Sequence, residues 1–166
     1  MTELAKKAVK LKHWRWKIGQ PVIALDGTDI DGVELAAFGG VVSGVGIWRD
    51  HDGNGHHDWV QVTDDESETW TVYPGDGHDL PDAVDSMMWD VELLPDFTGH
   101  LGCLVQVVRE AWSDDTVSAQ VYEFYSPHSG KVRKVGVNVR NEDGTRYQHC
   151  ADTEAGSLVA ALAAAE

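Results

Sequence analysis

The sequence is poor in cysteine and in long apolar runs. Its 166 residues include only two cysteines and five prolines. No apolar run approaches the roughly 20 residues of a membrane-spanning helix. The N-terminus lacks the apolar core of a secretory signal peptide. We therefore expect a protein that has no membrane association and works in the cytoplasm.

Motifs of nucleophilic and metal-dependent catalysis are also absent. The sequence has no G-x-S-x-G, no phosphate-binding P-loop and no H-E-x-x-H. The two cysteines, Cys103 and Cys150, do not form a C-x-x-C pair, and neither has a neighbour that would activate it. In a chain without a secretory signal, both are expected to be reduced thiols. These absences predict that the protein is not an enzyme.

Basic residues are scarce in the middle of the chain. The whole chain carries 28 acidic and 13 basic residues, a formal net charge of −15. Residues 1–17 carry +5, residues 18–97 carry −17 with Arg49 as their single basic residue, and residues 98–166 carry −3. Such a middle segment repels phosphate, so direct nucleic-acid binding is not expected. It would attract a basic protein surface, or it would only keep the protein soluble.

What is present predicts an α+β fold in three segments. Residues 1–12 form a basic N-terminal helix, with Leu4, Ala8 and Leu11 on one face. Residues 13–97 form an acidic β-rich unit, either a small bent antiparallel sheet or an SH3-like barrel. Its expected strands are 21–25, 40–48, 59–63, 69–73 and 88–94, with residues 64–68 as a hairpin loop. The stretches Trp59-Val-Gln-Val and Trp70-Thr-Val-Tyr-Pro-Gly75 resemble SH3-like barrels.

Residues 98–166 form an expected α-β-β-β-α unit, packed against the β-rich unit. A helix capped by Thr98 carries an apolar face from Leu101 to Trp112, and a last helix is capped by Asp152 or Thr153. The strands between them are 117–125, 132–140 and 146–150, with turns at Gly130 and 141–144. Two of the seven tryptophans, Trp70 and Trp112, are expected in the core, whereas Trp14, Trp16, Trp48 and Trp59 are left open.

That element order is also the order of a double-stranded-RNA-binding domain. Such domains hold phosphates with lysines at the start of the last helix. Here that position reads Asp152-Thr-Glu-Ala-Gly156, with two carboxylates where cations are needed. The topology is therefore compatible with the fold of these domains, but the charge argues against their RNA binding.

Two parts of the chain resemble a group of small phage and prophage proteins. The residues concerned are Leu94-Pro-Asp-Phe-Thr98, the helix 101–112, the segment from Thr153 to Leu162, and His13-Trp-Arg-Trp16 near the N-terminus. The resemblance implies a phage or prophage setting. The group has no assigned activity, so no catalytic residue follows from it.

A metal-binding motif lies in the segment Asp50-His-Asp-Gly-Asn-Gly-His-His-Asp58. It fits the first part of a calcium loop, with Asp50, Asp52, Asn54, His56 and Asp58 as the predicted ligands. Position twelve is Gln61 instead of a bidentate carboxylate, and the flanks indicate strands instead of helices. Calcium would therefore bind weakly. His51, His56 and His57 offer zinc or nickel as a further reading, and a plain solvated loop is the third.

The leading functional hypothesis is a non-enzymatic acidic binding protein of phage type. Seven carboxylates would occupy a basic surface of a host protein: Asp50, Asp52, Asp58, Asp64, Asp65, Glu66 and Glu68. A divalent-metal module and a virion or assembly component are the alternatives. The sequence leaves the oligomeric state open.

Overall fold

The chain consists of two compact units in a computed structural model that describes residues 2–28, 34–49, 56–72, 87–88, 92–99 and 101–165. We call Met1–Arg15 with His100–Glu166 the helical unit, and Trp16–Gly99 the acidic unit. The sequence predicts residues 1–12 as a separate helical segment. In the structure the N-terminal helix instead contacts the last helix, and its Ala5 and Ala8 are buried. The N-terminal segment is therefore part of the helical unit.

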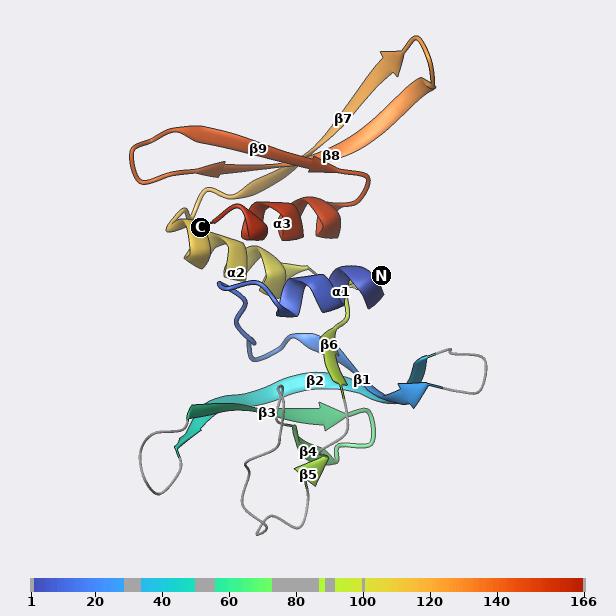
Figure 1. Ribbon diagram of the computed structural model, residues 1–166, viewed down its shortest axis with the longest axis vertical. Coiled ribbons are helices and arrows are strands. Elements are labelled where there is room, and N and C mark those ends of the chain that lie inside the picture. Colours follow the sequence, from blue (N-terminus) through green and yellow to red (C-terminus); the bar gives the residue numbers. More distant parts are fainter. Residues whose placement is uncertain are drawn as a thin grey trace. The chain divides into compact units, whose positions relative to one another are not determined.

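The acidic unit is built on one sheet (Figure 1). Its strands are β1 (Pro21–Thr28), β2 (Glu34–Arg49), β3 (His56–Asp64), β4 (Thr69–Val72), β5 (Met87–Met88) and β6 (Glu92–Pro95). They lie in the order β5-β4-β3-β2-β1-β6, and only the β4–β5 pair is parallel. The expected strand over residues 88–94 is replaced by the two short strands β5 and β6 at opposite edges.

The sheet is bent and open, which decides between the two expected architectures. The β2–β3 register shifts between Val42 and Gly44, and the β1–β2 register shifts twice. Such bulges bend a strand and increase its twist. Among the described residues no strand pairing joins β5 to β6, so the sheet does not close into an SH3-like barrel. The bent antiparallel sheet is the alternative that holds.

One face of this sheet carries the core of the acidic unit. The core residues are Val22, Ala24, Val42, Val60, Val62, Val72 and Leu93, with Trp16 and Phe38 packed against them. Val42 lies opposite Val62, and Val60 lies opposite Val72, so these side chains share one face. The period-two alternation at 59–63, recognised in the sequence, follows from this one-sided burial.

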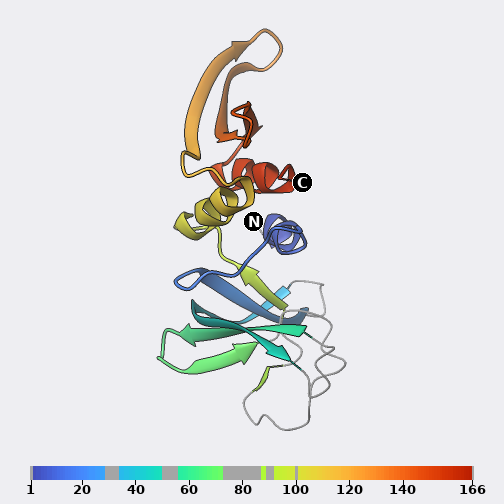
Figure 2. The same cartoon turned by 90° about the vertical axis from the view of Figure 1, so that its left-hand side faces the viewer.

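The helical unit places its helices on one face of a second sheet (Figures 1 and 2). Its elements are α1 (Thr2–Val9), α2 (Gly102–Trp112), β7 (Ser118–Ser126), β8 (Gly130–Arg140), β9 (Arg146–Ala151) and α3 (Glu154–Ala163). The antiparallel sheet has the order β7-β8-β9, and α3 contacts both β8 and β9. The α+β class and the α-β-β-β-α order of the C-terminal part are thereby confirmed.

Of the caps predicted for the helices α2 and α3, the one for α3 is confirmed and the one for α2 is wrong. The hydroxyl of Thr153 accepts the Gly156 N–H at 3.0 Å and caps α3 as expected. Leu101, not Thr98, precedes α2 at its N-cap. Thr98 instead donates its N–H and its hydroxyl to the Asp96 carboxylate, at 2.8 and 2.6 Å. A local Asx-type turn therefore competes successfully with the helix cap.

The two tryptophans predicted in the core, Trp70 and Trp112, are half-buried. The Trp112 indole N–H donates to the Ala161 carbonyl at 2.9 Å, and its ring packs on Tyr147 and His149. Trp70 stacks beside Phe38. Of the tryptophans left open, Trp14 is buried, Trp16 and Trp59 are half-buried, and the side chain of Trp48 lies outside the described residues. Among the described helices none has the length and apolar character that crossing a membrane requires.

Candidate functional site

The acidic turn, residues 64–68 between β3 and β4, is the best-defined part of the predicted binding surface. The Asp64 N–H donates to the Glu68 carbonyl at 3.0 Å, and the Ser67 N–H donates to the Asp64 carbonyl at 3.1 Å. Ser67 adopts a left-handed conformation, with φ at 69°. The predicted hairpin loop therefore forms a closed turn.

Asp64 organises this turn from inside. Its Oδ1 accepts the N–H groups of Glu66 and Glu68, at 3.0 and 2.9 Å, and its Oδ2 accepts the indole N–H of Trp70 at 3.0 Å. The Trp70 hydrogen bond, helped by the two backbone bonds and opposed by desolvation, lowers the pKa of the Asp64 carboxyl. The Asp64 carboxylate thus holds the turn, a role that the sequence did not indicate.

The other three carboxylates of the acidic turn face solvent. Asp65, Glu66 and Glu68 are exposed. The Asp64 carboxylate accepts the backbone N–H groups of Glu66 and Glu68 and so fixes the backbone at and beside these residues. Of the seven predicted partner-binding residues, these three are the ones that the structure places together as a free negative surface. The arrangement can bind cations or a basic surface by charge.

The predicted calcium loop is interrupted by a strand. Asp50, Asp52 and Asn54 lie outside the described residues, as does His51. His56 and Asp58 belong to β3, where they pair in the backbone with Arg49 and Ile47, and their side chains are not described. Positions seven to twelve of the motif are therefore extended backbone instead of a calcium-binding loop. Within the described parts of the chain, no group of three or more His, Cys, Asp or Glu is placed to hold a metal ion.

A network of polar side chains lies on the face of the helical unit's sheet that α3 does not cover. The sequence does not predict this network. The Tyr122 hydroxyl donates to Gln120 at 2.7 Å and accepts from the Gln148 amide at 2.5 Å, and Gln148 also donates to Asn138 at 3.1 Å. The Tyr122 ring lies over Gly136, where a Cβ would come within 2.6 Å of it. Gly136 close to the aromatic Tyr122 is the signal in the sequence that could indicate this network. It can be recognised only when the register of β7 against β8 is known.

Asp114 is a second carboxylate with an internal role. It is buried, and it accepts the N–H of Thr116 at 2.8 Å, the hydroxyl of Thr116 at 2.6 Å and the N–H of Arg140 at 2.7 Å. Burial raises the pKa of its carboxyl, but these hydrogen bonds and the charge of Arg140 outweigh that effect, so the pKa is lowered overall. Asp114 therefore ties the end of α2 to β8 and is not a free binding group.

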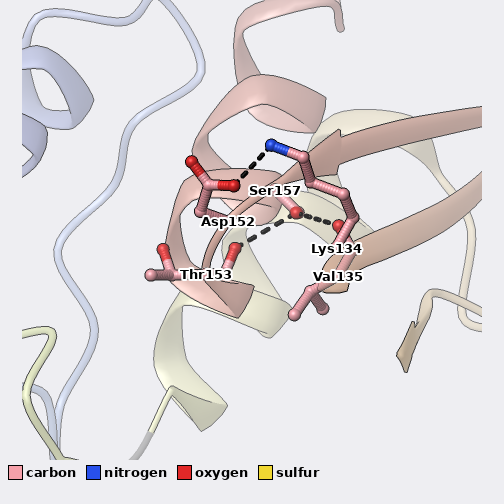
Figure 3. A network of polar contacts seen from close by, with 5 residues as sticks. All are labelled: Lys134, Val135, Asp152, Thr153 and Ser157. Carbon is pink, nitrogen blue, oxygen red and sulfur yellow. Dashed lines mark hydrogen bonds and ion pairs between the residues drawn. The ribbon is translucent and has the colours of Figure 1, made fainter. Parts of the chain in front are cut away.

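The start of α3 is engaged in structural contacts (Figure 3). Asp152 forms an ion pair with Lys134, and the Ser157 hydroxyl lies within hydrogen-bond distance of the Val135 carbonyl at 2.5 Å and the Thr153 carbonyl at 3.1 Å. A double-stranded-RNA-binding domain needs free cations at this position. Here Lys134 is paired with the Asp152 carboxylate, which offsets its positive charge.

The two thiols are separate. Cys103 is half-buried in α2 and Cys150 is exposed on β9, and no disulfide joins them. Comparisons with protein-family models, with curated proteins and with solved structures found no match for this chain. Any functional conclusion therefore depends on the chain's own residues.

Proposed function

We propose that the protein is a non-enzymatic acidic binding protein whose acidic unit occupies a basic surface of another protein. The observation that carries the proposal is the segregation of charge. The acidic unit holds 18 carboxylates and two basic residues, whereas the helical unit holds ten and eleven. A field of one sign over one unit attracts and orients a partner of the other sign.

Within the negatively charged surface of the acidic unit, the acidic turn is the part whose backbone is fixed by hydrogen bonds before a partner binds. Because Asp64 fixes the backbone of residues 66 and 68, the carboxylates of Asp65, Glu66 and Glu68 start from a preformed loop. A preformed loop loses less conformational entropy on binding than a flexible one does. The turn is therefore expected to contribute to affinity, and the rest of the acidic unit to the rate of association.

The proposed setting is the cytoplasm of a bacterial host that carries the phage or prophage. This part of the proposal follows from the resemblance of residues 13–16 and 94–166 to phage proteins. The partner would be a host protein with a surface rich in lysine and arginine. Direct contact of the acidic unit with nucleic acid would be opposed by its net charge of −16.

The test compares two neutralised triple variants. One carries Asp65→Asn, Glu66→Gln and Glu68→Gln in the acidic turn. The matched control carries Glu3→Gln, Asp115→Asn and Glu142→Gln, three exposed carboxylates of the helical unit. Both variants change the net charge by the same amount and leave Asp64 and Asp114 in place.

Each variant and the wild type would be used to capture partners from a bacterial lysate, washed at low and at high salt. We expect a basic protein that the wild type and the control retain, that the turn variant loses, and that high salt releases. Titration of the identified partner would then give the affinities. Equal retention by both variants would overturn the role of the acidic turn, and the absence of any salt-sensitive basic partner would overturn the proposed function.

A further inference from the structure

The edges of the two sheets differ in how well they are protected against pairing with another strand. Natural sheets protect their edges with short strands, charges, prolines or bulges. β5 has two residues, β6 has four and includes Glu92 and Pro95, and β9 has six and begins with Arg146. Each of these edges is short, and two of them carry a charge or a proline.

β7 lacks all of these protections. It has nine residues, Ser118–Ser126, and contains no proline. Its pairing with β8 runs from Ser118 to Ser126 without a register shift, so it has no bulge. Its single charged residue, Glu123, is already paired with Lys131 at 2.8 Å. Among the described residues β7 pairs with β8 alone, which leaves one row of its backbone groups without a strand partner.

The outer half of the β7–β8 hairpin also has no third strand. β9 pairs with residues 135–140 of β8, whereas β7 pairs with residues 130–138. The hairpin therefore extends past the end of β9, as both views show (Figures 1 and 2). Phe124 and Tyr125 are 51% and 80% exposed in this outer half, and Val121, level with the end of β9, is 53% exposed. A two-stranded ribbon with exposed apolar side chains gains stability from a further strand.

We infer that β7 is a site of strand addition and that its partner is β7 of a second copy of this chain. A two-fold axis through Tyr122, the midpoint of β7, pairs all nine residues in antiparallel register. This register places Ser118 opposite Ser126, Ala119 opposite Tyr125, Gln120 opposite Phe124 and Val121 opposite Glu123. No like charges face each other, the small Ala119 faces the large Tyr125, and Tyr122 faces its own copy on the axis. The helical unit has a net charge of only +1, so copies that meet through it add little repulsion there.

The register gives the inference a test with a matched control. Val121→Glu places one carboxylate opposite Glu123 in each of two symmetric pairs, whereas Val121→Lys places an ammonium group there. Both replace the same exposed side chain by a long charged one, so both should fold alike by circular dichroism. We expect the wild type to show a concentration-dependent dimer in sedimentation, Val121→Glu to weaken it about tenfold, and Val121→Lys to retain it.

Three results would overturn the inference. A wild type that stays monomeric up to millimolar concentration would exclude strand addition by a second copy. Equal loss in both variants would mean a nonspecific apolar contact, and equal retention would mean that the dimer uses another surface. Amide hydrogen exchange provides the local check, because protection of residues 118–126 should rise with protein concentration.

Discussion

The acidic unit and the helical unit differ in surface charge far more than in the chemistry of their cores. The acidic unit carries a net charge of −16 and the helical unit +1. Yet the acidic unit buries valines from its strands, and the helical unit buries leucines and valines from α2, β8 and α3. Among the described residues Asp114 is the one buried carboxylate, so the other described carboxylates lie outside the two cores. The exposed carboxylates of Asp65, Glu66 and Glu68 lie outside both cores, so their neutralisation should leave the fold intact.

Each unit also contains an aspartate whose carboxylate accepts several hydrogen bonds from the chain. Asp64 closes a turn at the surface of the acidic unit, and Asp114 joins α2 to β8 inside the helical unit. Both accept three or more donor contacts, counting backbone and side-chain groups. Each unit therefore contains an aspartate that works as a structural hydrogen-bond acceptor, Asp64 in one and Asp114 in the other.

The largest effect is expected for a core substitution in the helical unit. Leu158 of α3 is 1% exposed, and Leu158→Ala should lower the free energy of unfolding by about 2–5 kcal/mol, because it leaves a cavity between the helices and the sheet. Denaturant unfolding with residue-resolved hydrogen exchange would measure the loss and locate it. Exchange should increase in the helical unit first. A loss below about 1 kcal/mol would mean that this core is loosely packed.

The next effect concerns the internal carboxylate of the helical unit. Asp114→Asn replaces one accepting oxygen by an NH2 group, which faces the N–H of Arg140 or the donors of Thr116, and should cost about 1–3 kcal/mol at pH 7. Because folding lowers the pKa of this carboxyl, its stabilisation is present above the unfolded pKa and is lost as the pH falls through the folded value.

Wild type and Asp114→Asn should therefore converge in stability as the pH drops below about 4. Chemical denaturation at a series of pH values would measure this difference. Asp115→Asn, at the exposed neighbouring position, is the control and should leave stability nearly unchanged. A gap between wild type and Asp114→Asn that stays constant with pH would contradict the assigned role.

A matched glycine substitution compares the two sheets directly. At Gly40 a Cβ would lie 2.6 Å from the Thr63 carbonyl oxygen and 2.7 Å from Val62, so backbone must move. At Gly136 the nearest atoms belong to the Tyr122 side chain at the surface. Gly40→Ala should cost about 1–3 kcal/mol and Gly136→Ala less than about 1 kcal/mol, since a surface ring can turn aside. Thermal unfolding of the two variants would check the order, and a reversed order would show that Tyr122 is held rigidly by its amide partners.

The sequence predicted those elements whose signals are local. The alternation at 59–63 and 69–72 gave the β3–β4 hairpin, the apolar face from Leu101 to Trp112 gave α2, and Thr153 marked the start of α3. The second half of the calcium motif lies in β3 for the same reason. The alternation of Trp59, Val60, Gln61 and Val62 continues through its second half, and strand pairing there overrides a loop pattern.

The contacts that organise the site could not be predicted in this way. Trp70 reaches Asp64 across a turn, and Asp114 reaches Arg140 over 26 positions. Gly136 lies beneath Tyr122 because of the β7–β8 register, which residue types alone did not define. Each contact depends on tertiary placement. The composition therefore identifies the acidic residues. Only the structure shows that Asp64 has a structural role, whereas Asp65, Glu66 and Glu68 face solvent.

A smaller effect is expected when the indole of Trp70 is replaced. Trp70→Phe keeps an aromatic ring beside Phe38 but removes the N–H that donates to Asp64, so the pKa of Asp64 should rise toward its ordinary value of 3.8. Titration of the side-chain carboxyl by nuclear magnetic resonance would measure the change. Trp59→Phe on the neighbouring strand is the control and should leave this pKa in place. An unchanged pKa of Asp64 in Trp70→Phe would mean that the indole N–H does not stabilise the Asp64 carboxylate.

The smallest effect is expected from calcium. Since β3 takes up residues 56–61 of the predicted loop, only Asp50, Asp52 and Asn54 would remain as side-chain ligands outside the strand. A site with a millimolar dissociation constant stabilises the fold by only about 0.4 kcal/mol at an equal calcium concentration. Magnesium at the same concentration screens the acidic unit equally and serves as the control. We therefore expect the same shift of the melting temperature with both ions. A saturable shift specific to calcium, lost in the variant Asp50→Asn with Asp52→Asn, would reverse this conclusion and make the acidic unit a metal-binding module.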